Sequence, residues 1–162
     1  MRYADFGSIS SGTMQSEDLL ESFASELDYQ LSRQPCSFKR APYRKLIREA
    51  NQCLRRLNGE GTKAQQQEAE EYASEIVNDL IDNLTEFAPP LAYFGSHPGD
   101  GAEYGFWLHE DFQRDFDGLQ VEDTADIPRN YRGEVLHMND HGNATLYVAM
   151  SRGKLKEIWA VV

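Results

Sequence analysis

The sequence predicts an α+β fold, in which three N-terminal helices pack on a C-terminal antiparallel sheet of about five strands. Apolar residues recur at three- and four-residue spacing up to about residue 88, and from residue 91 they alternate with polar residues. The connections between the alternating segments are mostly short, and glycine and asparagine in them favour antiparallel pairing. Helices followed by strands indicate α+β rather than a parallel α/β sheet.

Three helices are predicted, and each is bounded by residues that begin or end helices. Their ranges are 16–33, 42–58 and 62–87. A serine or threonine can cap the first and the third, a proline opens the second, and glycine or proline follows all three. The apolar stripe expected for the third helix consists of Tyr72, Ile76, Val77, Leu80, Ile81, Leu84 and Phe87.

Strands are predicted after the third helix. Their ranges are 91–94, 103–109, 133–138, 144–150 and 155–162. A short helix is expected over 110–116, inside an acidic and irregular stretch. Residues 1–12, with the run GSISSGT, are expected to form a flexible arm. We expect a single domain over 1–162, with a helical half at 13–88 and a β-rich half at 91–162.

Length and composition exclude several classes of protein. A chain of 162 residues fits one globular domain. Its two cysteines, Cys36 and Cys53, make neither a disulfide framework nor a zinc motif, so we expect reduced thiols, with Cys53 packed in a helix. No apolar run approaches the ~18 residues of a membrane span. No basic region followed by an apolar stretch opens the chain, so a cytoplasmic location is expected, that of the host cell if a phage encodes the chain.

The charge of the chain is strongly segregated along the sequence. The formal net charge is −11, yet residues 39–63 carry +6 and residues 64–127 carry −15. Segregated charge steers encounters with charged partners. The basic second helix has no interleaved aromatic residues and no known nucleic-acid fingerprint, so direct contact with nucleic acid is not expected.

Acidic residues gather between residues 110 and 123. The six that we expect to bind a partner are Glu110, Asp111, Asp115, Asp117, Glu122 and Asp123. Their spacing does not match a calcium loop. A solvated acidic face is the simplest interpretation, and an acidic surface that docks on a basic groove is the alternative. Those of Phe112, Phe116 and Trp107 that are exposed are the candidate apolar contacts in such an interface.

Two turn-like segments hold the residues that could do chemistry. The segment GSHPGDGAEYG contains His97 and Asp100, and the segment NDHGN contains Asp140 and His141. If these loops meet in space, they could serve a small hydrolase or a nucleotide-binding enzyme. Tight turns require the same residue types, however. None of the four histidines has a metal-ligand spacing, so we expect no metal and no cofactor.

The second half of the chain also resembles a group of small acidic proteins carried by phages and other mobile elements. The resemblance rests on YFGSHPGDGAEYGFW, YRGEVLHMNDHGNATLYV and the closing EIWAVV, and it covers residues 91–162, with GSISSGT near the start. It brings no established activity or catalytic residue. It implies a non-enzymatic inhibitor of a host nucleic-acid-handling defence system, comparable to anti-CRISPR and anti-restriction proteins. A structural module that dimerises through a sheet edge or the first helix is a further alternative.

Overall fold

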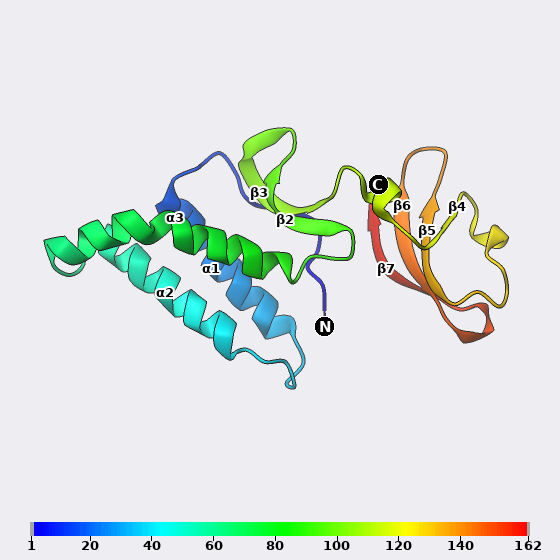
Figure 1. Ribbon diagram of the computed structural model, residues 1–162, viewed down its shortest axis with the longest axis horizontal. Helices are drawn as coiled ribbons and strands as arrows, with labels where there is room; N and C mark the ends of the chain where they lie inside the picture. Colours follow the sequence, from blue (N-terminus) through cyan, green and yellow to red (C-terminus); the bar gives the residue numbers. More distant parts are fainter. Residues whose placement is uncertain (1, 162) are drawn as a thin grey trace. The chain divides into compact units, whose positions relative to one another are not determined.

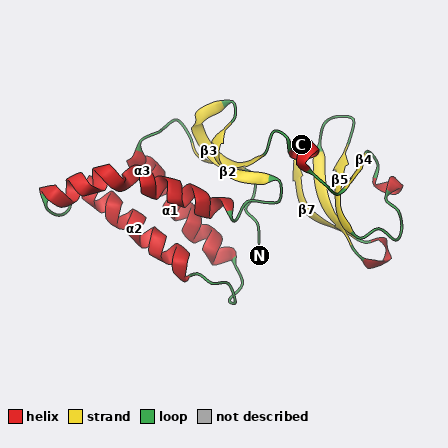
Figure 2. Ribbon diagram, in the orientation of Figure 1, coloured by secondary structure: helices red, strands yellow, loops and turns green. Residues whose placement is uncertain are grey.

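The computed structural model describes residues 2–161, apart from the side chain of Arg152. The chain divides into two compact units, unit 1 (Met1–His109) and unit 2 (Glu110–Val162) (Figure 1). The expected α+β class is confirmed, because each unit contains a sheet and unit 1 contains three long helices (Figure 2). The sequence predicts one domain whose halves meet near residue 90, whereas the structure keeps the first β-hairpin with the helices.

The elements of unit 1 follow the predicted helices closely. They are β1 (Gly7–Ser10), α1 (Ser16–Arg33), α2 (Ala41–Leu57), α3 (Lys63–Thr85), β2 (Ala92–His97) and β3 (Asp100–Leu108). Thr62 caps α3 as expected: its hydroxyl accepts the N–H of Gln65, and the Gln65 side chain accepts the N–H of Thr62 at 2.9 Å. This reciprocal capping box satisfies two backbone donors that the helix leaves free, which is why α3 begins where it does.

The three helices pack against one another around a continuous apolar core. Leu27, Leu80 and Leu84 are fully buried in it. The expectation that Tyr72 lies in this core is wrong, because Tyr72 is 52% exposed. Ala69 and Ala73 occupy the buried positions instead. The Cys53 thiol of α2 donates to the Ala69 carbonyl at 3.6 Å, so the two helices approach closely at small side chains, and the larger Tyr72 faces outward.

The sheet of unit 1 has the order β1-β3-β2, and both pairings are antiparallel. Residues 7–10, predicted to lie in a flexible arm, form its edge strand β1. The segment before β1 is also held, because the N–H of Ala4 donates to the carbonyl of Phe87 at 2.8 Å and Ala4 is buried. This short Ser/Gly-rich segment has no alternation of apolar and polar residues, so its sequence did not predict a strand. Backbone pairing with β3 does not require such an alternation.

The two cysteines should differ sharply in reactivity. Cys36 is exposed and Cys53 is buried between α2 and α3, where desolvation raises the pKa of its thiol. Because the thiolate is the reactive form, we expect one thiol per chain to react rapidly with Ellman's reagent at mildly alkaline pH, and Cys53 to react only after denaturation. A Cys36→Ser variant should lose the fast phase. A fast phase that persists in this variant would show that Cys53 is accessible.

Unit 2 is built on a second, four-stranded sheet. Its elements are α4 (Phe112–Asp115), β4 (Leu119–Val121), a 3-10 turn (Thr124–Asp126), β5 (Gly133–Met138), β6 (Ala144–Ala149), a second 3-10 turn (Ser151–Gly153) and β7 (Leu155–Val161). The strand order is β4-β5-β6-β7. Val135, Leu136 and Leu146 are fully buried, and Trp159 is buried beside them. Unit 2 therefore has an apolar core of its own.

The expectation of a single antiparallel sheet of about five strands is wrong in two respects. The strands divide between two sheets, and β4 pairs with β5 in parallel. β4 has three residues, too few for an alternating pattern to stand out in the sequence. Within residues 2–161, no helix combines the length and apolarity that crossing a bilayer requires.

Candidate functional site

The acidic segment, residues 110–123, forms the beginning of unit 2. It contains α4 and β4, and its six predicted partner-binding acids are all exposed. They are Glu110, Asp111, Asp115, Asp117, Glu122 and Asp123. A concentration of solvated carboxylates on a short segment creates a local negative potential, which is the feature that attracts a basic surface.

One arginine inside the segment offsets part of this charge. The Arg114 guanidinium pairs with Asp111 at 2.7 Å and with Asp115 at 3.1 Å. Asp123 serves a local role, because its carboxylate accepts the N–H of Ala125 at 2.8 Å and caps the following turn. In the part of the chain that the structure describes, Glu110, Asp117 and Glu122 take part in no ion pair. The carboxylates of these three residues and of Asp123 therefore carry the charge that no described ion pair in the segment offsets.

The three aromatic candidates differ in their availability to a partner. Phe112 is half-buried, with its ring edge-on to Trp159 at 6.3 Å between centroids. Phe116 is a candidate only if its ring is exposed, and its exposed fraction of 7% excludes it as an anchor for a partner. Its ring covers Gly118, where an added Cβ would overlap Phe116 and lie 2.7 Å from the Glu134 carbonyl. The missing side chain at Gly118 is what lets Phe116 turn inward.

Trp107 belongs to unit 1 and lies outside the acidic segment. It is half-buried, and its indole N–H donates to the Gly95 carbonyl at 3.0 Å. Its ring also meets the His97 ring edge-on, at 4.8 Å between centroids. These contacts give Trp107 a role in the β2–β3 hairpin. Phe112 is the remaining aromatic candidate on the acidic segment.

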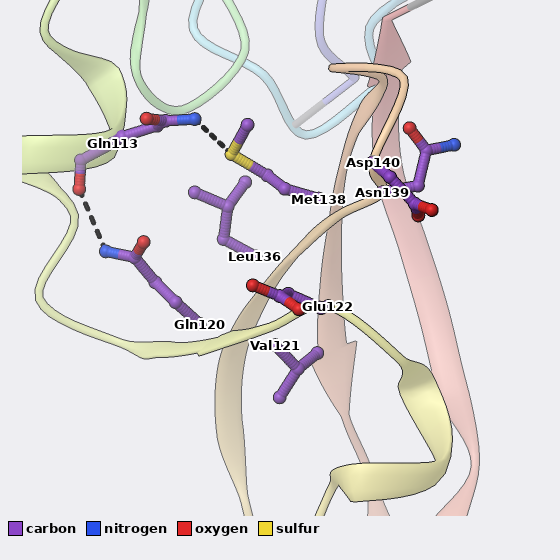
Figure 3. A pocket seen from close by; sticks show the side chains of 8 residues that line it. All are labelled: Gln113, Gln120, Val121, Glu122, Leu136, Met138, Asn139 and Asp140. Carbon is purple, nitrogen blue, oxygen red and sulfur yellow. Dashed lines mark hydrogen bonds between the residues drawn. The ribbon is translucent and has the colours of Figure 1, made fainter.

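A hollow of about 460 Å³ lies between the acidic segment and the sheet of unit 2 (Figure 3). Its lining residues are Gln113, Gln120, Val121, Glu122, Leu136, Met138, Asn139 and Asp140. The Gln120 amide donates to the Gln113 carbonyl at 2.9 Å, and the Gln113 amide contacts the Met138 sulfur. These two contacts hold α4 against β4 and β5, so the side chains that line the hollow come from three elements.

The lining of the hollow suits a long basic side chain. Glu122 and Asp140 provide carboxylates, while Gln113, Gln120 and Asn139 provide amide groups. Val121, Leu136 and Met138 provide an apolar surface. Arginine and lysine cover apolar surface with their methylene stems and direct the charged group to carboxylates. The hollow therefore has the chemistry to hold one basic side chain of a partner.

Sequence reasoning did not connect Asp140 with the acidic segment. It considered Asp140 only together with His141, in a tight turn or, as the alternative, in a chemical loop, whereas the structure places Asp140 in the lining of the same hollow as Glu122. The parallel pairing of Val121 with His137 brings the end of β4 beside the end of β5. That pairing joins segments about 16 residues apart through a strand with no recognisable pattern, so no sequence signal pointed to it.

The two loops considered for catalysis lie in different units. In unit 1, His97 Nδ1 accepts the N–H of Gly99 at 3.0 Å, and the Asp100 carboxylate accepts the N–H of Ala102 at 3.0 Å. In unit 2, the side chain of Asn139 accepts the N–H groups of His141 and Asn143, both at 3.0 Å. The polar side chains of both loops thus stabilise their own tight turns.

The prediction that the chain holds no metal stays a prediction. Among the described residues, no three His, Cys, Asp or Glu side chains come together in an arrangement that could hold an ion. His97 and Asp100 are register partners across the β2–β3 hairpin. Within residues 2–161, no third His, Cys, Asp or Glu side chain joins them to complete a metal site.

Comparison of the chain with protein-family models, with curated proteins and with solved structures gave no match.

Proposed function

We propose that the chain is a non-enzymatic binding protein whose acidic segment docks on a basic surface of a protein partner. The observation that carries the proposal is the hollow whose lining includes both Glu122 and Asp140, beside the exposed acids of the segment. Dispersed carboxylates raise the rate of encounter, and a shaped acidic hollow gives one basic side chain of the partner a fixed position. Phe112 supplies an apolar contact at the edge of the acids.

The proposed partner is a nucleic-acid-handling protein of a host defence system, and the chain would inhibit it by occupying its basic groove. Support comes from the resemblance of residues 91–162 to proteins of phages and mobile elements, and from the acidic surface, whose charge mimics that of nucleic acid. If this is right, duplex DNA or RNA should compete with the chain for the partner in a pull-down from host lysate. A captured partner that nucleic acid does not displace contradicts groove occupation.

The docking surface can be tested with a short arginine-rich peptide as the probe. Reversal of Asp111, Asp115 and Asp117 to lysine should weaken peptide binding roughly 10-fold to 100-fold at low ionic strength, because steering by complementary charge is lost. In an NMR titration of the wild-type chain with the peptide, the side-chain amide signals of Gln113 and Gln120 should shift, because both side chains line the hollow.

A matched control variant has the same change of net charge on residues outside the acidic segment. Reversal of Glu17, Glu21 and Asp28, three exposed acids of α1, should leave peptide binding within about threefold of the wild type, because these acids do not belong to the proposed docking surface. A variant with Glu122→Gln and Asp140→Asn loses the two carboxylates that line the hollow and keeps the other acids of the acidic segment. It should also bind the peptide more weakly than the wild type. The docking proposal is wrong if the control reversal weakens binding as much as the reversal in the acidic segment.

A further inference from the structure

Two adjacent helices of unit 1 carry opposite charge. α2 contains five basic residues and one acid, a net charge of +4, and α3 contains six acids and one lysine, a net charge of −5. The helices lie side by side and antiparallel (Figure 1). Arg56 pairs with Glu68 at 3.4 Å at one end, and Tyr43 donates to Glu86 at 2.7 Å at the other.

The opposite charges of the two helices mostly do not neutralise each other within the chain. Lys45 pairs with Glu49 inside α2, and Arg55 pairs with Glu60 in the following loop. For residues 2–161, Arg56–Glu68 is the ion pair that joins α2 to α3. Arg48 on α2 takes part in none, and neither do three exposed acids of α3. Those acids are Glu71, Glu75 and Asp79.

Charged residues of both helices line a groove between α2 and α3. The groove holds about 150 Å³, and its lining includes Arg56 from α2 and Glu68, Tyr72 and Ile76 from α3. Residues three, four and seven positions apart lie on one side of a helix. Lys45, Arg48 and Arg55 are three and seven positions apart, so they form one basic stripe on α2. This stripe lies next to the groove, because Glu49 and Gln52 line the groove and also border the stripe. Glu71, Glu75 and Asp79 extend the acidic side of the face around the groove, and the 52% exposed ring of Tyr72 lies between this side and the basic stripe.

We propose that this face, the α2/α3 face, binds a second copy of the chain through two-fold symmetry. A two-fold interface must be complementary to itself. If the axis runs parallel to the helices, α2 of each copy lies on α3 of the other, and both contacts join opposite charges. An axis across the helices would place α2 on α2 and α3 on α3, and both contacts would be repulsive. The charge pattern thus selects one arrangement of the pair.

The size of the α2/α3 face sets the strength to expect. α2 is 17 residues long, roughly 25 Å, and two adjacent helices are about 20 Å wide, so each copy contributes a footprint of about 500 Å². Both copies together bury about 1,000 Å², the lower end of specific interfaces. Tyr72 lies next to the axis and is the expected central contact, since aromatic residues dominate such interfaces. We therefore expect a reversible, salt-sensitive dimer with a micromolar Kd.

The arrangement also determines which charges meet. An axis parallel to the helices keeps each residue at its own level along them. The contacts of Arg56 with Glu68 and of Tyr43 with Glu86 set those levels. They place Arg48 level with Asp79, and Arg55 level with Glu71, because antiparallel helices advance by the same rise per residue. The charged residues at these two levels are therefore the ones to exchange in a test of the dimer.

Sedimentation equilibrium of the full chain tests the proposal. The wild type should dimerise at low ionic strength, with a Kd roughly 10-fold higher near 0.5 M salt, where screening is strong. Arg48→Glu with Arg55→Glu lowers the net charge of α2 from +4 to 0 and places acids opposite the acids of α3 at both levels. Glu71→Arg with Asp79→Arg changes the net charge of α3 from −5 to −1 and places bases opposite Arg48 and Arg55. Each double variant alone should be monomeric. An equimolar mixture of the two should form a one-to-one heterodimer, and the chain with all four changes should dimerise again.

Several results would overturn the proposal, and a folding control accompanies them. Glu21→Arg with Asp28→Arg, a reversal on exposed positions of α1, should leave the Kd unchanged. A wild type that stays monomeric at low salt contradicts the proposal directly, whatever the variants do. Double variants that dimerise alone place the interface elsewhere, and oligomers larger than a dimer exclude the two-fold arrangement. Circular dichroism checks that every variant retains its helices.

Discussion

Replacing Gly105 with alanine is expected to detach β1 from β3 and to destabilise unit 1 by about 1–3 kcal/mol. Gly105 lies in β3 opposite Ser8. An added Cβ would overlap the carbonyl oxygen of Gly7, and it would lie 2.9 Å from the Gly7 carbonyl carbon and 2.8 Å from the Trp107 ring. A flexible side chain could move aside, but a backbone carbonyl in a strand moves only with its strand. β1 must therefore shift, and its pairing with β3 is lost.

Gly101→Ala is the matched control for this prediction. Gly101 lies in the same strand, and an added Cβ there meets no atom within 4 Å. Hydrogen exchange should show that the amides of residues 7–10 lose protection in Gly105→Ala and keep it in Gly101→Ala, while denaturant titration gives the stability of both. Undiminished protection of β1 in Gly105→Ala would show that the two backbones are farther apart than the structure has them.

The same glycine explains why the sequence misled on the first twelve residues. A run of serine and glycine predicts a mobile arm when it is considered by itself. The partner strand, however, has a glycine among aromatic residues, and a glycine in a strand interior marks a close approach of another backbone. The information that β1 is a strand was thus carried by Gly105, about 95 residues away. The strand can be recognised only when the two segments are considered as a pair.

The helices could be predicted because their signals are local. Proline, glycine and the Thr62 capping box bound them, and the observed ends of α1, α2 and α3 lie within two residues of the predicted ones. The misplaced Tyr72 shows the limit of this reasoning. Helical spacing gives the apolar stripe, but the partner helix decides which edge of the stripe is covered, and α2 covers the alanines rather than the tyrosine.

The candidate site was predictable only in its charge. Exposed carboxylates follow from composition alone, and all six predicted acids of the acidic segment are exposed. The hollow depends on tertiary structure, because Glu122 and Asp140 line it together only through the parallel pairing of β4 with β5. The sequence left the exposure of Phe116 open for a related reason. Its burial depends on the space left by Gly118 and on the strand β5 beneath it.

The other large effect expected is that of Phe23→Ala, which should destabilise unit 1 by about 3–5 kcal/mol. Phe23 is fully buried. Its ring meets Phe94 of β2 edge-on at 5.0 Å between centroids and lies 5.4 Å from the ring of Tyr104 in β3. This side chain of α1 therefore packs α1 against the hairpin, beside the hydrogen bonds that join Thr85 of α3 to Phe94. A loss of this size is a large share of the total stability of an ordinary domain, about 5–15 kcal/mol.

Tyr29→Ala on the same helix provides the comparison for Phe23→Ala. It also removes an aromatic ring, but Tyr29 is 54% exposed and its ring contacts the Arg33 guanidinium at 5.5 Å, so the loss should stay below about 1 kcal/mol. Denaturant titration followed by circular dichroism at the helix band reports unit 1, because α1, α2 and α3 all belong to it. Similar midpoints for the two variants would mean that Phe23 does not join α1 to the sheet. A low midpoint for Phe23→Ala alone is the result that the packing of Phe23, Phe94 and Tyr104 requires.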